Sequence, residues 1–289
     1  MNNFIPESEL IINADGSIYH LCLKPENLAS LIFTVGDPER VGLVSQYFDQ
    51  IDFQAANREF VTHTGRLNGR RVTVMSTGMG TDNIEILMTE LDALVNVDFE
   101  TRTIKEQKSV LDIIRLGTSG SMQNDLEVGT LLAADKAIGL DTLMQFYPTL
   151  SGNQEFAQLV QKTLEISFTP YQAAASHMLM DQLPVDFQKG ITLTAPGFYA
   201  PQGRQVRIKP KMNQLIERLA MLEYNGQKLT NFEMETAGYY AMGELLGHRM
   251  LSLNAIVVNR PAKQMDKEAG KTVDRLIQTA LAAFCVEQR

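Results

Sequence analysis

Two glutamates on either side of a methionine form the most suggestive chemical pattern in this chain. They lie in segment 231–237, which reads N-F-E-M-E-T-A and leads into a stretch with helical character. A carboxylate can accept two hydroxyl hydrogen bonds at once, and a thioether can cover an apolar ring face. Glu233, Met234 and Glu235 could therefore hold a sugar by its hydroxyls. The ordinary alternative is that these glutamates only offset the dipole at the start of a helix.

Two further segments place an arginine beside glycines, close to the end of an apolar strand. Segment 36–41 reads G-D-P-E-R-V, in which Gly36 lets the backbone approach an anion and Arg40 lies one helical turn later. On its own it is more typical of a plain strand-to-helix turn with a solvated arginine. Segment 115–121 reads R-L-G-T-S-G-S and places Arg115 inside the strand itself. A buried charge needs a partner, which is either a phosphate, the interpretation we favour, or a buried carboxylate.

Two more segments place polar groups at strand ends, and the first of them carries groups that suit a flat heterocycle. Segment 197–204 reads G-F-Y-A-P-Q-G-R, and segment 255–261 reads A-I-V-V-N-R-P and ends a strand with an arginine. Gln202 and Arg204 offer an acceptor and several donors, while Phe198 can stack on a ring. An ordinary surface loop is the alternative for the first of these segments. Because ligands of α/β sheets gather beyond the carboxyl ends of strands, we expect these segments to form one site.

Apolar runs with strand character alternate with helical periodicity, which predicts an α/β fold. The predicted strands are 31–35, 71–76, 112–116 and 251–258. The predicted helices are 84–95, with Asp82 as its N-cap, 154–166, 211–222 and 273–284. The charged segment 98–108 is interpreted as a surface insert. No repeat or long linker divides the chain, so a single domain over residues 1–289 is predicted.

The composition argues against several classes of protein. Of the 289 residues, 44% are apolar and 21% charged, which suits a large core. The net charge of −8 and the lack of a basic run argue against a nucleic-acid-binding surface, and no apolar stretch suits a membrane span. No secretory signal is visible, and Cys22 and Cys285 suit a reducing compartment, so a cytoplasmic location is expected. Four scattered histidines without a ligand motif predict no metal site.

The motifs G-D-P-E-R-V, R-L-G-T-S-G, F-Y-A-P-Q-G-R and N-F-E-M-E-T occur here in the order and rough spacing found in the nucleoside phosphorylase superfamily. The resemblance runs from about His20 to Arg260 and is greatest to the uridine-cleaving members. It implies a single α/β domain with a central mixed, distorted β-sheet flanked by helices. It also implies reversible cleavage of uridine by inorganic phosphate, giving uracil and ribose 1-phosphate, without a cofactor.

The resemblance assigns roles to individual residues. Phosphate binding is expected of Gly36, Arg40, Arg58, Arg115 and Thr118. Ribose binding is expected of His20, Glu233, Met234 and Glu235. Base binding is expected of Ser119, Gly120, Phe198, Gln202, Arg204 and Arg260. Four of these would be catalytic, namely Arg115, Glu235, Gln202 and Arg204. His20 and Arg58 would come from a neighbouring subunit, so the resemblance implies a homo-oligomer of at least two chains with shared sites.

Several positions depart from the family pattern. Val258 and Asn259 stand where the purine-cleaving members have a serine and a proton-donating aspartate, which favours a pyrimidine. Asn83 replaces a serine of a monovalent-cation site, although Glu59 is kept, so a potassium requirement stays open. Gly203 replaces a bulkier residue, which leaves the choice among uridine, thymidine and deoxyuridine open. The alternatives are a purine nucleoside phosphorylase, a nucleosidase that uses water, and a nucleoside-binding protein without catalysis.

Overall fold

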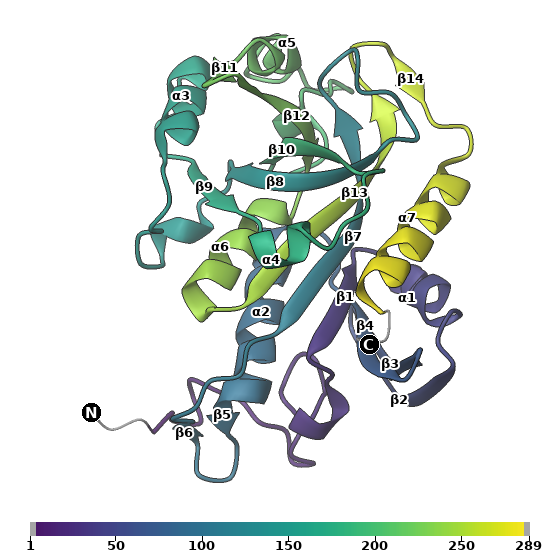
Figure 1. The fold of residues 1–289 in the computed structure, drawn as a ribbon. Coiled ribbons are helices and arrows are strands. Elements are labelled where there is room, and N and C mark those ends of the chain that lie inside the picture. Colours follow the sequence, from purple (N-terminus) through teal and green to yellow (C-terminus); the bar gives the residue numbers. More distant parts are fainter. Residues whose placement is uncertain (1–3, 286–289) are drawn as a thin grey trace.

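A distorted mixed β-sheet forms the centre of the protein in the computed structural model, which describes residues 4–285. Twelve strands belong to it, in the order β11-β12-β10-β8-β13-β7-β1-β4-β3-β2, with β9 beside β8 and β14 beside β13. An additional antiparallel pairing joins β12 to β7, so β12, β10, β8, β13 and β7 close into a small barrel (Figure 1). Parallel and antiparallel pairs occur in the same sheet, which confirms the predicted fold class.

The strands have the following bounds: β1 Leu31–Val35, β2 Gln50–Asn57, β3 Phe60–Leu67, β4 Arg70–Ser76, β5 Val97–Asp98, β6 Thr103–Ile104, β7 Asp112–Ser121, β8 Leu131–Gly139, β9 Tyr171–Ala174, β10 Gln188–Thr194, β11 Glu223–Tyr224, β12 Gln227–Glu233, β13 Arg249–Asn259 and β14 Gln264–Met265. The α-helices are α1 Pro38–Ser45, α2 Thr81–Asn96, α3 Glu155–Leu164, α4 His177–Met180, α5 Leu215–Ala220, α6 Thr236–Leu246 and α7 Ala269–Phe284. Three short 3-10 helices cover Pro25–Asn27, Leu143–Gln145 and Ala200–Gln202.

Helices cover the sheet on both sides, with α2 and α6 on the left of the view and α7 and α1 on the right (Figure 1). The predicted apolar face of α7 is confirmed, since Leu276, Ile277 and Ala280 are all buried. Helix α6 is buried on every side through its first two turns. It is therefore held by packing from all directions, which suits an element that fixes the position of a site.

Strand β7 is longer than predicted, and this changes the shape of the site. The sequence suggested a strand ending before Gly117, but β7 runs on to Ser121. Its parallel ladder with β13 continues to the Asn259–Ser121 pair, which keeps this stretch extended. On the opposite edge β1 stops beside Leu116, and β12 begins to pair only at Gly120. Between those two points no strand of residues 4–285 pairs with this edge of β7.

Two helix predictions were also wrong in detail. Asp82 is not the N-cap of α2, because the helix begins at Thr81 and its N-cap is Gly80. The helix expected at 211–222 is reduced to α5, since Gln214 adopts a left-handed conformation with φ 50° immediately before it. The charged segment 98–108 contains the second strand of the β5–β6 hairpin, whose turn is fixed by Asp98 Oδ1 accepting from the Glu100 and Thr101 amides at 2.9 Å each.

Candidate active site

A cavity of about 630 Å³ lies where β7 loses its neighbouring strand. It brings together residues from the five chain segments that the sequence singled out, together with part of the loop before α2. Among its walls are Gly36, Arg40, Arg115, Thr118, Ser119, Gly120, Phe198, Gln202, Arg204, Glu233, Met234 and Glu235. The predicted site residues that do not line it are His20, Arg58 and Arg260. The cavity thus brings cationic, carboxylate and aromatic groups together.

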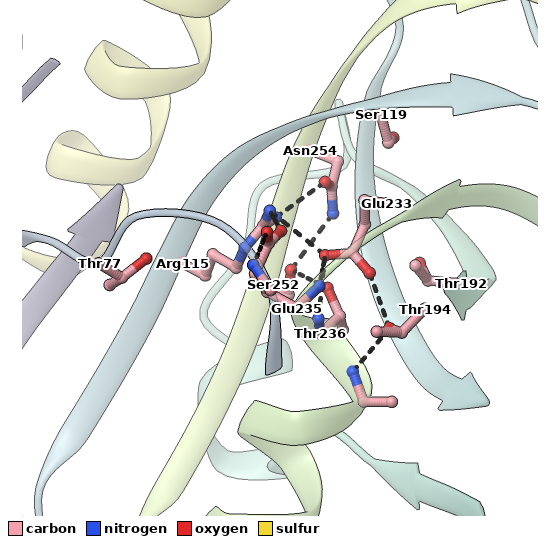
Figure 2. A network of polar contacts seen from close by, with 12 residues as sticks. Thr77, Arg115, Ser119, Thr192, Thr194, Glu233, Glu235, Thr236, Ser252 and Asn254 are labelled. Atoms are coloured by element: carbon pink, nitrogen blue, oxygen red, sulfur yellow. Dashed lines mark hydrogen bonds and ion pairs between the residues drawn. The ribbon is translucent and has the colours of Figure 1, made fainter. Parts of the chain in front are cut away.

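Arg115 lies at the centre of this cavity with only 5% of its surface exposed. Its Nη2 pairs with Glu235 Oε2 and lies 3.3 Å from Glu233 Oε2. Its Nη1 donates to Asn254 Oδ1 at 3.1 Å (Figure 2). The buried carboxylate that was the alternative partner for Arg115 is therefore present, supplied by Glu235 and Glu233. Burial acts to lower the pKa of Arg115, but Glu233 and Glu235 outweigh it and the pKa is raised, so the group stays charged.

The two glutamates have different surroundings. Glu233 Oε1 accepts from Thr194 Oγ1 at 2.7 Å, and its Oε2 accepts from the amides of Glu235 and Thr236 at 3.0 and 2.9 Å. It therefore caps the start of α6, which is the ordinary role considered for this segment. Glu235 Oε1 instead accepts a single hydrogen bond, from the Gly80 amide at 2.9 Å. Burial raises the pKa of Glu235, while Arg115 opposes the rise.

Arg40 supplies a second cation to the cavity. Pro38 occupies the first turn of α1, as predicted, and Asp37 caps the helix by accepting from the Glu39 amide at 2.9 Å. Arg40 Nη1 donates to the Leu116 carbonyl at 3.3 Å, at the point where β1 leaves β7. Among residues 4–285 no ion pair within 4.0 Å joins Arg40 to a carboxylate. Burial and the nearby Arg115 both lower the pKa of Arg40, and a bound anion would oppose both effects.

The other end of the cavity is formed by the loop that carries Gln202 and Arg204. Gln202 is 4% exposed, and its Oε1 accepts from Arg204 Nη1 at 2.6 Å. The Arg204 guanidinium lies 3.7 Å from the centre of the Phe198 ring and covers one of its faces. Burial, and then the nearby Arg260, lower the pKa of Arg204. Because Arg204 holds the oxygen of Gln202, the amide hydrogens of Gln202 are the groups left for a ligand.

Arg260 lies behind this loop, not in the cavity. Its Nη1 donates to the Gln202 carbonyl at 3.1 Å, and it lines a neighbouring hollow together with Gly203. The preceding Asn259 is buried and clamps a turn. Its Nδ2 donates to the carbonyls of Gln123, Asn124 and Leu126 at 3.1, 3.2 and 3.0 Å. Asn259 therefore has no polar group directed to a ligand, whereas Val258 lines the cavity.

His20 and Arg58 lie together outside the cavity of their own chain. Asn57 Nδ2 donates to the His20 carbonyl at 2.9 Å, and Arg58 lies 5.8 Å from the centre of the Tyr19 ring. Glu90, a buried residue of α2, bonds His20 Nδ1 at 2.7 Å. The other ring nitrogen of His20 is then left for a group outside this cluster. Both residues that the resemblance assigns to a neighbouring subunit thus belong to one surface cluster.

The other predictions concern the cation site at Asn83 and Glu59, metal ions in general and membrane spans. Asn83 Nδ2 donates to the Met79 carbonyl at 3.4 Å, and Glu59 approaches the same loop at Gly78. Within residues 4–285 no group of three or more His, Cys, Asp or Glu side chains could hold a metal ion. In the same part of the chain no helix is long and apolar enough to cross a membrane.

Sequence reasoning missed four residues that shape the cavity: Gly80, Thr194, Phe232 and Asn254. Thr194 Oγ1 joins Glu233 to α6, since it also accepts from the Ala237 amide at 2.9 Å. Phe232 lines the cavity beside Gly120, where a Cβ would lie only 3.1 Å from the Phe232 ring. A signal existed for Asn254, because an amide inside an apolar strand requires a buried polar partner. Nothing local in the sequence marked Gly80 or Thr194.

Comparison with known proteins agrees with this geometry. A family model described as "Phosphorylase superfamily" matches residues 30–286. The uridine phosphorylase of Thermococcus kodakarensis is 30% identical over 260 residues, covering 89% of this chain and 83% of that enzyme. The purine nucleoside phosphorylase DeoD-type of Streptococcus suis is 26% identical over 279 residues, covering 93% and 99%.

Solved structures give the same result. A Trypanosoma brucei nucleoside phosphorylase, described as showing uridine phosphorylase activity, has a TM-score of 0.84 and 30% identity, covering 95% of this chain and 99% of that one. A purine nucleoside phosphorylase from Toxoplasma gondii has a TM-score of 0.68 and 19% identity, covering 92% and 94%, and bears on the fold alone. The chain described here belongs to the phosphorylase superfamily.

Proposed function

We propose that this protein is a uridine phosphorylase, which transfers the ribosyl group of uridine to inorganic phosphate. The observation that carries the proposal is the arrangement of charges in one cavity. Arg40 lines the same cavity as Arg115 and its partner Glu235, and another part of the cavity offers the Gln202 amide and the Arg204 guanidinium. A cationic subsite beside a carboxylate and a donor-rich subsite is what phosphate, ribose and uracil require.

Phosphate and ribose would share the Arg115–Glu235 pair. Arg40, which has no carboxylate partner within 4.0 Å among residues 4–285, would bind the phosphate first. Ribose hydroxyls would then donate to Glu235 and release part of the Arg115 guanidinium toward the phosphate. A phosphate oxygen attacks the anomeric carbon as the bond from that carbon to N1 of uracil breaks. The negative charge of Glu235 stabilises the positive charge that develops on the sugar.

The base end favours a pyrimidine leaving group. Uracil departs with an electron pair on its ring, so it is stabilised by the Gln202 amide hydrogens and the nearby Arg204 cation. A purine would instead depart most easily if an acid protonated its ring. The acids that line the cavity among residues 4–285 are Asp37, Glu233 and Glu235. Asp37 caps α1, and the two glutamates surround Arg115, so this end of the cavity supports uridine over inosine.

The cluster of His20 and Arg58 supports a site completed by a second copy of the chain. An exposed arginine and a histidine tied to Glu90 are positioned on the surface by their own chain, but they do not enter its cavity. In this proposal they reach the phosphate and the ribose of a neighbouring subunit, and a single isolated chain has little activity.

The test is a comparison of two nucleosides with and without phosphate. We expect uracil release from uridine only when phosphate is present, and little hypoxanthine release from inosine. Release of uracil at the same rate without phosphate would indicate a nucleosidase. Faster cleavage of inosine would indicate a purine nucleoside phosphorylase, and saturable uridine binding without any product would indicate a binding protein.

A further inference from the structure

Asn254 is a fully buried amide in the middle of β13, with none of its surface exposed. Its Oδ1 accepts from Arg115 Nη1 at 3.1 Å, and its Nδ2 donates to Ser252 Oγ at 3.3 Å. Ser252 Oγ in turn bonds Thr236 Oγ1 at 2.8 Å at the start of α6 (Figure 2). Because a guanidinium can only donate, the atom that faces it must be the amide oxygen, so the orientation of Asn254 is settled.

Gly117 provides the space in which this contact forms. Asn254 is paired in register with Gly117 on the neighbouring strand β7. A Cβ at Gly117 would lie 1.8 Å from Arg115 Nη1 and 2.5 Å from its Cζ. The Arg115 side chain therefore runs along its own strand toward Gly117 and lies over the backbone of that residue, which has no side chain. There it contacts the Asn254 oxygen.

The contacts of Arg115 hold it from different sides. Both carboxylates are bound through Nη2, whereas Asn254 holds Nη1. A guanidinium beside a carboxylate prefers to turn both nitrogens toward it in a two-bond grip. Without Asn254, a two-bond grip with Glu235 would engage a second nitrogen of Arg115 and leave fewer donors for an anion. Glu233 is held in place by Thr194 and the start of α6 and contacts Arg115 only through Nη2, so it does not fix Nη1.

We infer that Asn254 is a positioning residue that keeps Arg115 available to phosphate. It does not line the cavity, so it acts only through Arg115. Its neutrality matters, because Arg40 and Arg115 balance Glu233 and Glu235 in charge. A carboxylate at position 254 would give the cavity a net negative charge and repel a phosphate dianion. The inference rests on the proposed use of phosphate, but not on the identity of the base.

The experiment compares Asn254→Ala, Asn254→Asp and the control Ser252→Ala in the full-length protein. Ser252→Ala removes the partner of the amide hydrogens but leaves the contact between Asn254 and Arg115. We expect Asn254→Ala to raise the KM for phosphate about tenfold, because a hydrogen bond to a charged group is lost. Asn254→Asp, which has the same shape and places a carboxylate beside a cation, should raise it further. The KM for uridine should change less than about twofold in either variant, since the groups that touch the nucleoside are unaltered.

Phosphate titration of the protein without nucleoside, followed by the shift in Tm, measures the same weakening directly. This measurement tests the role of Asn254 even if uridine proves not to be the substrate. A failure of the role of Asn254 can therefore be told apart from a failure of the proposed function. A wild-type phosphate KM in Asn254→Asp would overturn the inference. So would an equal rise of both KM values in Asn254→Ala, because a merely structural role predicts that pattern. A rise of the phosphate KM in Ser252→Ala as large as in Asn254→Ala would overturn it as well.

Discussion

The backbone amide of Gly80 donates to Glu235 Oε1 at 2.9 Å, although the two residues are 155 positions apart in the chain. Gly80 is the N-cap of the 16-residue helix α2, so the carboxylate lies against the positive end of that helix. Together with Arg115, this contact opposes the effect of burial on the pKa of Glu235. In the proposed function Glu235 accepts ribose hydroxyls, and this contact favours its ionised form inside the protein.

Replacing Gly80 should weaken this contact. Gly80 has φ 95° and ψ 160°, a conformation that is essentially limited to glycine. Gly80→Ala should therefore move the amide and lower kcat about tenfold, the effect of losing a hydrogen bond to a charged group. Gly226→Ala is the control, because Gly226 also has a positive φ of 74° but lies in the β11–β12 turn with open space at its Cβ. Equal activity of the two variants would argue against a role for the Gly80 amide.

The pH dependence of the reaction should report on Glu235. Burial raises its pKa above the ordinary value of 4.5, and the protonated form cannot attract a cationic sugar. The enzyme is therefore fully active above the raised pKa of Glu235, and activity is lost as the pH falls through that pKa. We expect the acid limb of kcat/KM for uridine, measured at saturating phosphate, to lie above pH 4.5.

The matching variant is Glu235→Gln, which keeps the shape of the side chain but removes its charge. Its kcat should fall roughly 100-fold or more, as when one preorganised electrostatic group is removed from an active site. The acid limb assigned to Glu235 should disappear from its pH profile. An unchanged limb in this variant would assign that titration to another group.

Arg40 offers the cleanest test of the phosphate subsite. Removing Arg115 would leave two buried carboxylates without their cation and would destabilise the fold. Arg40 instead carries like charge to its neighbour Arg115, so Arg40→Ala should leave Tm nearly unchanged. We expect it to raise the KM for phosphate about tenfold or more. Arg66→Ala, which removes an exposed arginine of β3, should leave that KM at the wild-type value.

Sharing of sites between subunits can be tested by complementation. Arg58→Ala and Arg40→Ala should each be poorly active alone. When the two are co-expressed in equal amounts, a mixed pair contains one site with both arginines intact. About a quarter of the wild-type activity should then return if subunits assemble at random in reciprocal pairs. Activity that stays at the average of the two separate variants would show that Arg58 does not act in the site of a neighbouring subunit.

Much of this architecture could be predicted from the sequence, because local signals marked it. Apolar runs bounded by glycine predicted β1 and β4, and apolar periodicity predicted α7. The order of four motifs identified the superfamily. Gly36, Arg40 and Glu235 were predicted as site residues because their types suit an anion or a sugar, and the structure places all three in one cavity.

The features that were missed depend on contacts between distant segments. The extension of β7 past Gly117 comes from its ladder with β13, which local turn propensity does not reveal. The cap that Glu233 provides for α6 requires Thr194 from another strand. Asn254 could be seen as an oddity in an apolar strand, but its partner Arg115 lies 139 positions away. Arg260 was predicted to be near the base, yet its direction toward the Gln202 carbonyl depends on the fold of the whole loop.

In the proposed function a phosphate takes the ribosyl group from uridine, and the stoichiometry of the products tests this most directly. Incubation of the wild-type protein with uridine and inorganic phosphate can be followed by ³¹P NMR together with the absorbance change of uracil release. We predict that a phosphate monoester appears in equal amount to uracil as inorganic phosphate is consumed. Uracil formed while the inorganic phosphate signal stays constant, or no uracil at all, would contradict the account.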